Sequence, residues 1–147
     1  MMIVAAMLLI AQATDFGVRT PGGAPAPSRG RSTSASTFPC AVSYVTDGDT
    51  FRCSNGTRVR LSSIDTPEMP GSCRPGRHCA PGDPYAAKAA LQRLIGGRTV
   101  QCEPVGVSYN RVAAWCSSGG VDLSCAMVRS GHAIRLSHYE KYRKVCE

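Results

Sequence analysis

Residues 40–68 read CAVSYVTDGDTFRCSNGTRVRLSSIDTPE, and this stretch decides the expected fold. Apolar and polar residues alternate on both sides of Asp47-Gly48, which is typical of two strands joined in a β-hairpin. A second turn signal, Ser-Asn-Gly at 54–56, introduces a third strand over Thr57–Ile64. Three consecutive strands therefore open the domain, and acidic residues follow two of their ends.

A loop and a helix come next. Residues 69–83 are rich in Gly and Pro and predict a loop. Asp83 is placed to cap a helix that starts at Pro84 and ends at Gly96. The helix has one apolar face, which we expect to pack on the core and which consists of Ala87, Leu91, Leu94 and Ile95.

Two more strands and a short helix complete the expected order. The strands cover Thr99–Val105 and Arg111–Cys116, and Asp122 then caps a helix that Gly131 closes. Five strands with a helix inserted after the third predict a five-stranded Greek-key β-barrel of the oligonucleotide/oligosaccharide-binding (OB) type, with two helices. An open α+β sheet is the alternative, because the number of strands does not separate the two.

The chain divides into three segments of different composition. An apolar run from Met2 to Ile10, followed by Ala-Gln-Ala, is too short to span a bilayer, so residues 1–13 predict a secretory signal peptide. No Lys or Arg precedes the run, which leaves a misplaced start or a short uncleaved anchor as alternatives. Residues 14–38 are rich in Pro, Gly, Ser and Thr and predict a disordered linker. Residues 39–147 then form one folded domain.

The folded segment contains all the cysteines of the chain, namely Cys40, Cys53, Cys73, Cys79, Cys102, Cys116, Cys125 and Cys146. An even number behind a signal peptide predicts disulfides and an oxidising compartment, so we expect a secreted or periplasmic protein. Symmetry about the two hairpin turns pairs Cys40 with Cys53 and Cys102 with Cys116. The remaining pairs are then Cys73–Cys79, within one loop, and Cys125–Cys146, which joins the second helix to the tail. A zinc site is less compatible with the sequence, because there is no CxxC pair and His78 stands alone beside Cys79.

The chain is strongly basic. It has 17 Lys and Arg against 10 Asp and Glu, a formal net charge of +7. Most of these cations are arginines, whose planar guanidinium group matches phosphate oxygens in a bidentate way, so a polyanionic partner is favoured. Solubility alone explains the charge equally well.

The acidic residues lie where neighbouring strands end. Asp49 follows the first turn and Asp65 ends the third strand, so their carboxylates would repel each other unless a cation lay between them. Ca²⁺ suits such a site because it takes hard oxygen ligands in irregular geometry, whereas Mg²⁺ is stricter. With only two carboxylates, we expect a Ca²⁺ site of low affinity.

Glu68 and two arginines would supply the chemistry of a phosphodiesterase. Pro67 holds Thr66 extended and carries Glu68 past the carboxylates, where it can take a proton from an attacking water. Arg60 and Arg111 can stabilise the charge that develops on a phosphate during hydrolysis. Each motif alone is more often a plain turn or a solvated strand, and it is their joint presence that favours a catalytic site.

Five motifs follow one another along the chain: VTDGDTF (45–51), VRLSSIDTPE (59–68), YAAKAALQRLI (85–95), YNRVAAW (109–115) and VDLSCAMVRSGHA (121–133). In order and spacing they resemble the staphylococcal-nuclease-like (thermonuclease) family, over about residues 42–134. The resemblance implies a five-stranded barrel. It also implies a Ca²⁺-dependent nuclease that cuts the 5′ P–O bond of DNA and RNA and leaves 3′-phosphates.

The resemblance assigns roles to single residues. It implies Ca²⁺ ligation by Asp49, Asp65 and the carbonyl of Thr66. It implies general base catalysis by Glu68 and phosphate binding by Arg60 and Arg111. Tyr109 matches a tyrosine that contacts the substrate.

The chain also departs from the family pattern. Tyr-Asn-Arg at 109–111 replaces the usual Tyr-Gly-Arg, and the tail HYEKYRKVCE (138–147) shows no counterpart of a third helix. We expect the Cys125–Cys146 disulfide to hold the tail in place of that helix.

Three functions are compatible with parts of this sequence. The first is a nuclease that acts on nucleic acid as a monomer, without a stable protein partner or membrane contact beyond an uncleaved N-terminal segment. The second is a catalytically silent module that binds single strands; such a module could lose Glu68, Arg60 or Arg111, which are all present, and aromatic residues are only 6% of the chain. The third, a disulfide-stapled inhibitor or adhesion domain, leaves the paired acids unexplained. The prediction is therefore the nuclease.

Overall fold

The computed structural model of the chain describes residues 36–141 and 143–147. The predicted signal peptide and the linker up to residue 35 lie outside the described residues. The first strand begins at Phe38, one residue before the predicted start of the domain. The elements are, in order, β1 (Phe38–Val45), β2 (Thr50–Cys53), β3 (Arg58–Leu61), β4 (Ile64–Asp65), α1 (Pro84–Ile95), β5 (Thr99–Ser108), β6 (Arg111–Ser118), β7 (Val121–Asp122), α2 (Leu123–Arg129), β8 (Ile134–Arg135) and the 3₁₀ turn η1 (Ser137–Tyr139).

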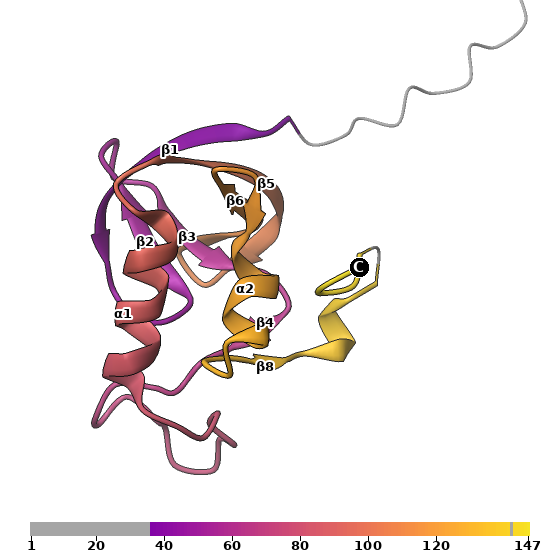
Figure 1. The fold of residues 1–147 in the computed structure, drawn as a ribbon. Helices are drawn as coiled ribbons and strands as arrows, with labels where there is room; N and C mark the ends of the chain where they lie inside the picture. The colour runs from indigo at the N-terminus through magenta and orange to yellow at the C-terminus, as the bar shows by residue number, and fades with distance from the viewer. Residues whose placement is uncertain (1–35, 142) are drawn as a thin grey trace, which may run out of the picture. The chain divides into compact units, whose positions relative to one another are not determined.

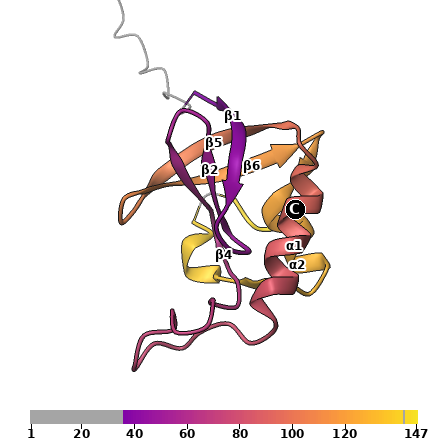
Figure 2. The same ribbon diagram turned by 90° about the vertical axis from the view of Figure 1, so that its left-hand side faces the viewer.

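Five of the strands close into a barrel (Figure 1). Antiparallel pairing joins β3 to β2, β2 to β1, β1 to β5 and β5 to β6. The parallel pairing of β3 with β6, in which Val59 lies opposite Val112, then joins the two edges. Figure 2 shows both helices on one side of this barrel. The predicted closed barrel with two helices is confirmed, and the open sheet is excluded.

Apolar side chains that alternate along the strands fill the barrel. Phe51, Val59, Leu61 and Val100 are inaccessible to solvent, and they pack in one core with side chains of both helices. Burying a side chain of this size contributes about 1.5–3 kcal/mol. The core contains none of the charged residues that are described below.

The sequence signals at both ends of α1 are confirmed. The side chain of Asp83 accepts hydrogen bonds from the backbone N–H groups of Tyr85 at 2.8 Å and Ala86 at 3.2 Å. Gly96 ends the helix in the left-handed region, with φ of 53°. The buried face of the helix consists of Ala87, Ala90, Leu91 and Ile95, with Leu94 partly buried beside it.

The prediction of one strand over Thr57–Ile64 is wrong at its end. β3 stops at Leu61, and the chain turns at Ser62 and Ser63, where Ser63 has φ of 61°. The reason lies in contacts that are distant in sequence. The hydroxyl of Ser124 on α2 donates to the carbonyl of Ser62 at 3.0 Å, and β4 pairs with β8 in the tail.

Among its described residues, the C-terminal tail contains the 3₁₀ turn η1 but no third α-helix, and it packs on the domain. Val145 is buried, its N–H donates to Glu140 at 3.1 Å, and Arg135 forms an ion pair with Glu140 at 2.8 Å. The Cys125–Cys146 disulfide joins this tail to α2. The expected role of that disulfide is thus consistent with the fold.

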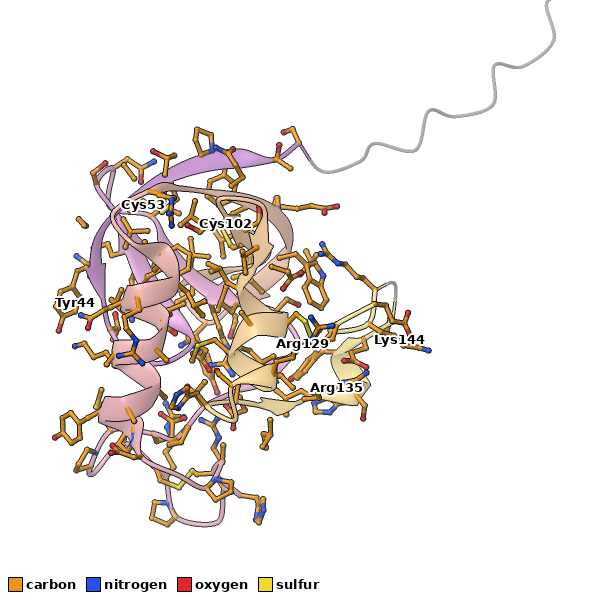
Figure 3. The ribbon with its side chains drawn as sticks, viewed as in Figure 1. Tyr44, Cys53, Cys102, Arg129, Arg135 and Lys144 are labelled. Atoms are coloured by element: carbon orange, nitrogen blue, oxygen red, sulfur yellow. A yellow bond between two sulfur atoms is a disulfide. The ribbon has the colours of Figure 1, made fainter. Side chains whose placement is uncertain are left out.

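All four predicted disulfides are present: Cys40–Cys53, Cys73–Cys79, Cys102–Cys116 and Cys125–Cys146. Figure 3 draws the side chains and labels Cys53 and Cys102, which belong to the two bridges that join neighbouring strands in the core. Each disulfide typically stabilises a fold by about 2–4 kcal/mol, and four of them fit an oxidising, extracellular-type environment. Within the described ranges, no helix is long and apolar enough to cross a membrane.

Candidate active site

A polar cavity of about 310 Å³ lies where four segments of the chain meet. These segments are the β1–β2 turn, strand β3, the loop that follows β4, and the β5–β6 turn. The lining residues are Asp47, Asp49, Arg58, Arg60, Thr66, Glu68, Ser72, Arg74, Arg77, Tyr109, Asn110 and Arg111.

Gly48 lets the β1–β2 turn approach the rest of the site closely. A Cβ atom at this position would lie 2.8 Å from Cβ of Ala87 on α1 and 2.9 Å from Cβ of Thr66. The backbone of Gly48 is outside the left-handed region, so close packing rather than turn geometry requires the glycine. The expected Asp-Gly turn is in fact a four-residue connection, 46–49, which is packed against Thr66.

Arg60 joins two buried carboxylates. Its Nη1 lies 2.9 Å from Asp49, and its Nη2 donates to Asp65 at 3.0 Å and to the carbonyl of Ile64 at 3.1 Å. Asp49 and Asp65 are only 3% and 4% exposed. Burial favours the neutral form of Arg60, but the attraction of Asp49 and Asp65 is stronger, so the pKa of Arg60 is raised.

Asp49 is poorly stabilised as an anion. The pKa of Asp49 is raised to about 7, mainly by burial and also by the negative charges of Asp47 and Asp65, against the opposing effects of Arg60 and Thr50. A further cation beside this carboxylate would favour its ionised form.

Arg111 is connected to the same carboxylate through Thr50. Its Nη1 donates to the hydroxyl of Thr50 at 3.2 Å, and that hydroxyl donates to Asp49 at 2.8 Å. Two further bonds to Ser108, to its carbonyl at 3.4 Å and its hydroxyl at 3.3 Å, fix the guanidinium group. Burial, and then the charge of Arg60, lower the pKa of Arg111.

Glu68 lines the cavity and is paired with an arginine that the sequence did not single out. Nη1 of Arg77 lies 2.9 Å from the Glu68 carboxylate, and its Nη2 lies 3.2 Å from Asp65. The side chain of Glu68 is 20% exposed, so water can reach it. Arg77 thus holds Glu68 and Asp65 in fixed relative positions.

Tyr109 is at the exposed tip of the β5–β6 turn. It is 78% exposed and has φ of 56°, a left-handed conformation that costs a tyrosine about 1–2 kcal/mol. The guanidinium carbons of Arg74 and Arg111 lie 5.7 and 5.9 Å from the centre of its ring. An exposed aromatic ring between two cations is a suitable stacking surface for a nucleic acid base.

The structure brings most of the predicted site residues together. The cavity is lined by Asp49, Arg60, Thr66, Glu68, Tyr109 and Arg111. Asp65 does not line it but lies directly beside it, bound to Arg60 and Arg77.

Sequence reasoning missed Asp47, Arg58, Ser72, Arg74, Arg77 and Asn110. Asp47 and Asn110 lie within two of the five motifs, beside residues to which those motifs assign a role. The motifs could therefore have indicated them. Arg74 and Arg77 lie in the loop between β4 and α1, where no periodicity predicts a direction; only the charge of CRPGRHC (73–79) hints at them.

The oxygen donors available for a cation are few. Across residues 36–141 and 143–147, no group of three or more His, Cys, Asp or Glu side chains is placed to hold a metal ion. The candidate donors are therefore the carboxylates of Asp49 and Asp65 with Thr66, and Asp47 lines the same cavity.

No protein-family model matches the chain, and no curated protein matches it. The function must therefore be inferred from the residues of the site.

Proposed function

We propose that the protein is a secreted, Ca²⁺-dependent nuclease of the staphylococcal-nuclease-like family. The observation that supports this proposal is a single connected network of hydrogen bonds and ion pairs at one cavity. The network runs in the order Arg111, Thr50, Asp49, Arg60, Asp65, Arg77 and Glu68. It contains every charged residue that the motifs predicted for the site.

The strand order supports an OB-type Greek-key barrel. Around the barrel the order is β1, β2, β3, β6 and β5, with the helix α1 between the third and fourth barrel strands in the chain. In barrels of this type, nucleic acid binds across the strands and the loops beside them. The cavity includes β3 and the β1–β2 and β5–β6 turns, which is consistent with that mode.

The donor set fits a hard divalent cation. Asp49, Asp65 and the carbonyl of Thr66 offer oxygen atoms only, as Ca²⁺ prefers, and burial raises the pKa of Asp49, so that a cation beside this carboxylate would favour its ionised form. When bound, Ca²⁺ would neutralise negative charge on the phosphate undergoing attack. With two carboxylates, its affinity would be low.

Glu68 acts as the general base. Its ion pair with Arg77 orients the carboxylate, which accepts a proton from the attacking water. The water oxygen forms a new bond to phosphorus while the bond to the 5′ oxygen breaks. The 5′ oxygen takes a proton from solvent, and the other product keeps a 3′-phosphate.

Arg60 and Arg111 bind the phosphate oxygens. Both guanidinium groups are held by neighbouring side chains, Arg60 by Asp49 and Asp65 and Arg111 by Ser108 and Thr50. Fixed donors stabilise the extra charge of the transition state without reorganisation. Five arginines against three acids line the cavity, so its charge suits a polyanionic substrate.

The test is an assay of the full-length, disulfide-bonded chain on single-stranded DNA and single-stranded RNA, with Ca²⁺ and with a chelator. We expect cleavage with Ca²⁺, none with the chelator, and products that carry 3′-phosphates. Glu68→Gln is the matched inactive control. Binding of nucleic acid without cleavage under all conditions would contradict the nuclease and favour the silent binding module.

A further inference from the structure

The loop that carries Arg77 lies outside the packed part of the domain. Figures 1 and 2 show that the segment between β4 and α1 extends away from the barrel. No residue of 69–79, all of which the structure describes, belongs to the hydrophobic core. The backbone hydrogen bonds of this segment, at 2.9 and 3.1 Å, are formed within the loop itself. The loop is therefore held to the domain through side chains, among them the ion pairs of Arg77 with Glu68 and Asp65.

The Cys73–Cys79 disulfide is packed against the backbone of Arg77. The Sγ atoms of Cys73 and Cys79 lie 3.8 and 3.9 Å from the carbonyl oxygen of Arg77. The bridge closes a short ring, with a sequence separation of 6, and Arg77 is a member of that ring. Because neither the core nor a strand or helix fixes this backbone, the bridge limits the direction from which the Arg77 guanidinium group can approach Glu68.

This bridge is also more accessible to solvent than the other three. Cys73 is exposed, Cys79 is half-buried, and all residues of 71–78 are exposed. The cysteines of the two bridges between strands are at most 2% exposed, and those of the bridge to the tail are partly buried against the core. Thiol–disulfide exchange requires a thiolate to reach a sulfur atom, and exposed disulfides are the labile ones. A reductant should therefore open Cys73–Cys79 first.

We propose that the Cys73–Cys79 bridge is a modification site for a dithiol reductant, and that its opening releases Arg77 from the position in which it orients Glu68. This inference rests on the proposed nuclease function and assigns a regulation to that site: the bridged form is active and the opened form is slow. The side chains of the core and the three other bridges are unchanged by the reaction, so the fold should persist in both forms.

The exchange proceeds in two steps. One thiolate of the reductant attacks a sulfur of the bridge, which forms a mixed disulfide and releases the other cysteine as a thiol. The second thiol of the reductant then displaces the remaining cysteine. Two electrons and two protons pass to Cys73 and Cys79, and the reductant ends as a disulfide.

Selective opening is tested on the full-length, disulfide-bonded chain without denaturant. The protein is incubated with increasing dithiothreitol and alkylated with iodoacetamide, and its peptides are identified by mass spectrometry. We expect Cys73 and Cys79 to be labelled before any other cysteine, with an almost unchanged melting temperature. Earlier labelling of another bridge would overturn the proposal. Reduced thioredoxin is the second probe: opening by both reagents supports a protein dithiol as the source, and opening by dithiothreitol alone supports a small one.

The coupling to Arg77 is tested by combining variants. Cys73→Ser/Cys79→Ser lacks only this bridge, and we expect its kcat to fall about tenfold with a smaller change in KM, as in Arg77→Ala. Adding Arg77→Ala to the serine variant should cost no further activity, since the bridge then acts only through Arg77. A second tenfold loss in the triple variant would show independent effects and overturn the coupling.

Reduction of wild type gives the same information without a substitution. Dithiothreitol at the selective concentration should lower the kcat of wild type by the factor found for Cys73→Ser/Cys79→Ser, and reoxidation should restore it. The serine variant is the matched control, because it has no bridge to open at this position and its kcat should not respond to the reagent. An equal response of the two proteins would assign the effect to another bridge and overturn the proposal.

A measurement without substrate separates this proposal from the nuclease function. In ¹⁵N-arginine-labelled protein, the ion pairs of Arg77 should slow rotation of its guanidinium group and give separate Nη signals, which should merge when the bridge is opened. If the signals merge but no condition gives cleavage, the modification site stands and the nuclease function is wrong. If the protein cleaves DNA and neither the signals nor kcat change on opening, the nuclease stands and the modification site is wrong.

Discussion

Arg77 forms an ion pair with Glu68 at 2.9 Å, although the two are nine positions apart in the chain and no strand or helix contains Arg77. The second amino group of Arg77 lies 3.2 Å from Asp65, whose carboxylate also binds Arg60. One exposed loop therefore orients the residue that we assign as general base. The loop itself is closed by the exposed Cys73–Cys79 disulfide.

Replacing Arg77 should lower kcat more than it raises KM. In Arg77→Ala the Glu68 carboxylate loses the ion pair that orients it, so we expect kcat to fall about tenfold or more. Arg77→Lys should restore part of the loss, since an ammonium group can reach one of the two carboxylates. Steady-state kinetics on a labelled oligonucleotide measure both constants; an unchanged kcat in Arg77→Ala would contradict the positioning role.

Glu68→Gln should remove the base and leave the fold intact. Glu68 lies at the surface of the cavity with one ion pair, so its replacement exposes no apolar core. General base catalysis is typically worth about 10²–10⁴-fold, and we expect a loss of kcat in this range with an unchanged melting temperature. Cleavage at nearly the wild-type rate would remove Glu68 from the mechanism.

Arg60→Lys should impair both stability and activity. A lysine cannot bridge Asp49, Asp65 and the carbonyl of Ile64 at once, so at least one buried acceptor would lose its donor. We expect a loss of about 1–3 kcal/mol in the free energy of unfolding and a large fall in kcat. Urea unfolding and kinetics measure the two effects; Arg93→Lys, on the exposed face of α1, is the control. If Arg60→Lys behaves like that control, Arg60 is only a surface residue of β3.

The fold and the central part of the site were predictable because the signals for them involve residues that are close together in the sequence. The cap at Asp83, the glycine at the end of α1 and the alternation along β1, β2 and β6 each depend on residues a few positions apart. The acids of TDGDT and DTPE follow strand ends, and strands that pair bring their ends together. Two of the four disulfide pairs, Cys40–Cys53 and Cys102–Cys116, followed from the symmetry of the hairpins.

What the sequence did not predict depends on contacts between distant segments. The turn at Ser62 and Ser63 is stabilised by Ser124 on α2 and by the tail, which no pattern in residues 57–64 indicates. Arg74 and Arg77 lie in a loop whose path is fixed by a disulfide and by ion pairs to Glu68 and Asp65. Neither hydrophobic periodicity nor capping carries information on the direction of such side chains.

The raised pKa of Asp49 predicts a pH dependence of stability. A folded-state pKa of about 7, above the ordinary value of 3.8, means that the folded protein binds the proton more tightly than the unfolded chain. This contribution to stability is present at low pH and is lost as the pH rises from about 4 to about 7. Asp49→Asn should remove the loss and be more stable than wild type at pH 8, by an amount on the order of a few kcal/mol.

Urea unfolding between pH 4.5 and pH 8 in a chelator measures this effect. Other groups of the chain also contribute to the pH profile, so the informative quantity is the difference between wild type and Asp49→Asn at each pH. Added Ca²⁺ should raise the stability of wild type at pH 8 and leave Asp49→Asn almost unchanged. Identical pH profiles for the two proteins would contradict this prediction, because they would show that ionisation of Asp49 does not lower the free energy of unfolding.

Gly48→Ala should disturb the site through packing alone. The added Cβ would lie 2.8 Å from Cβ of Ala87 and 2.9 Å from Cβ of Thr66, so the turn that carries Asp49 must move away from Thr66. Overpacking of this kind costs about 1–3 kcal/mol, and because Asp49 moves with the turn, cleavage should also slow at saturating substrate. Gly106→Ala is the matched control, since Gly106 also lies outside the left-handed region and a Cβ there meets no atom within 4 Å. Thermal unfolding and kinetics of both variants decide the matter: if Gly48→Ala is as stable and as active as Gly106→Ala, the close approach of the turn to α1 and Thr66 does not position the site.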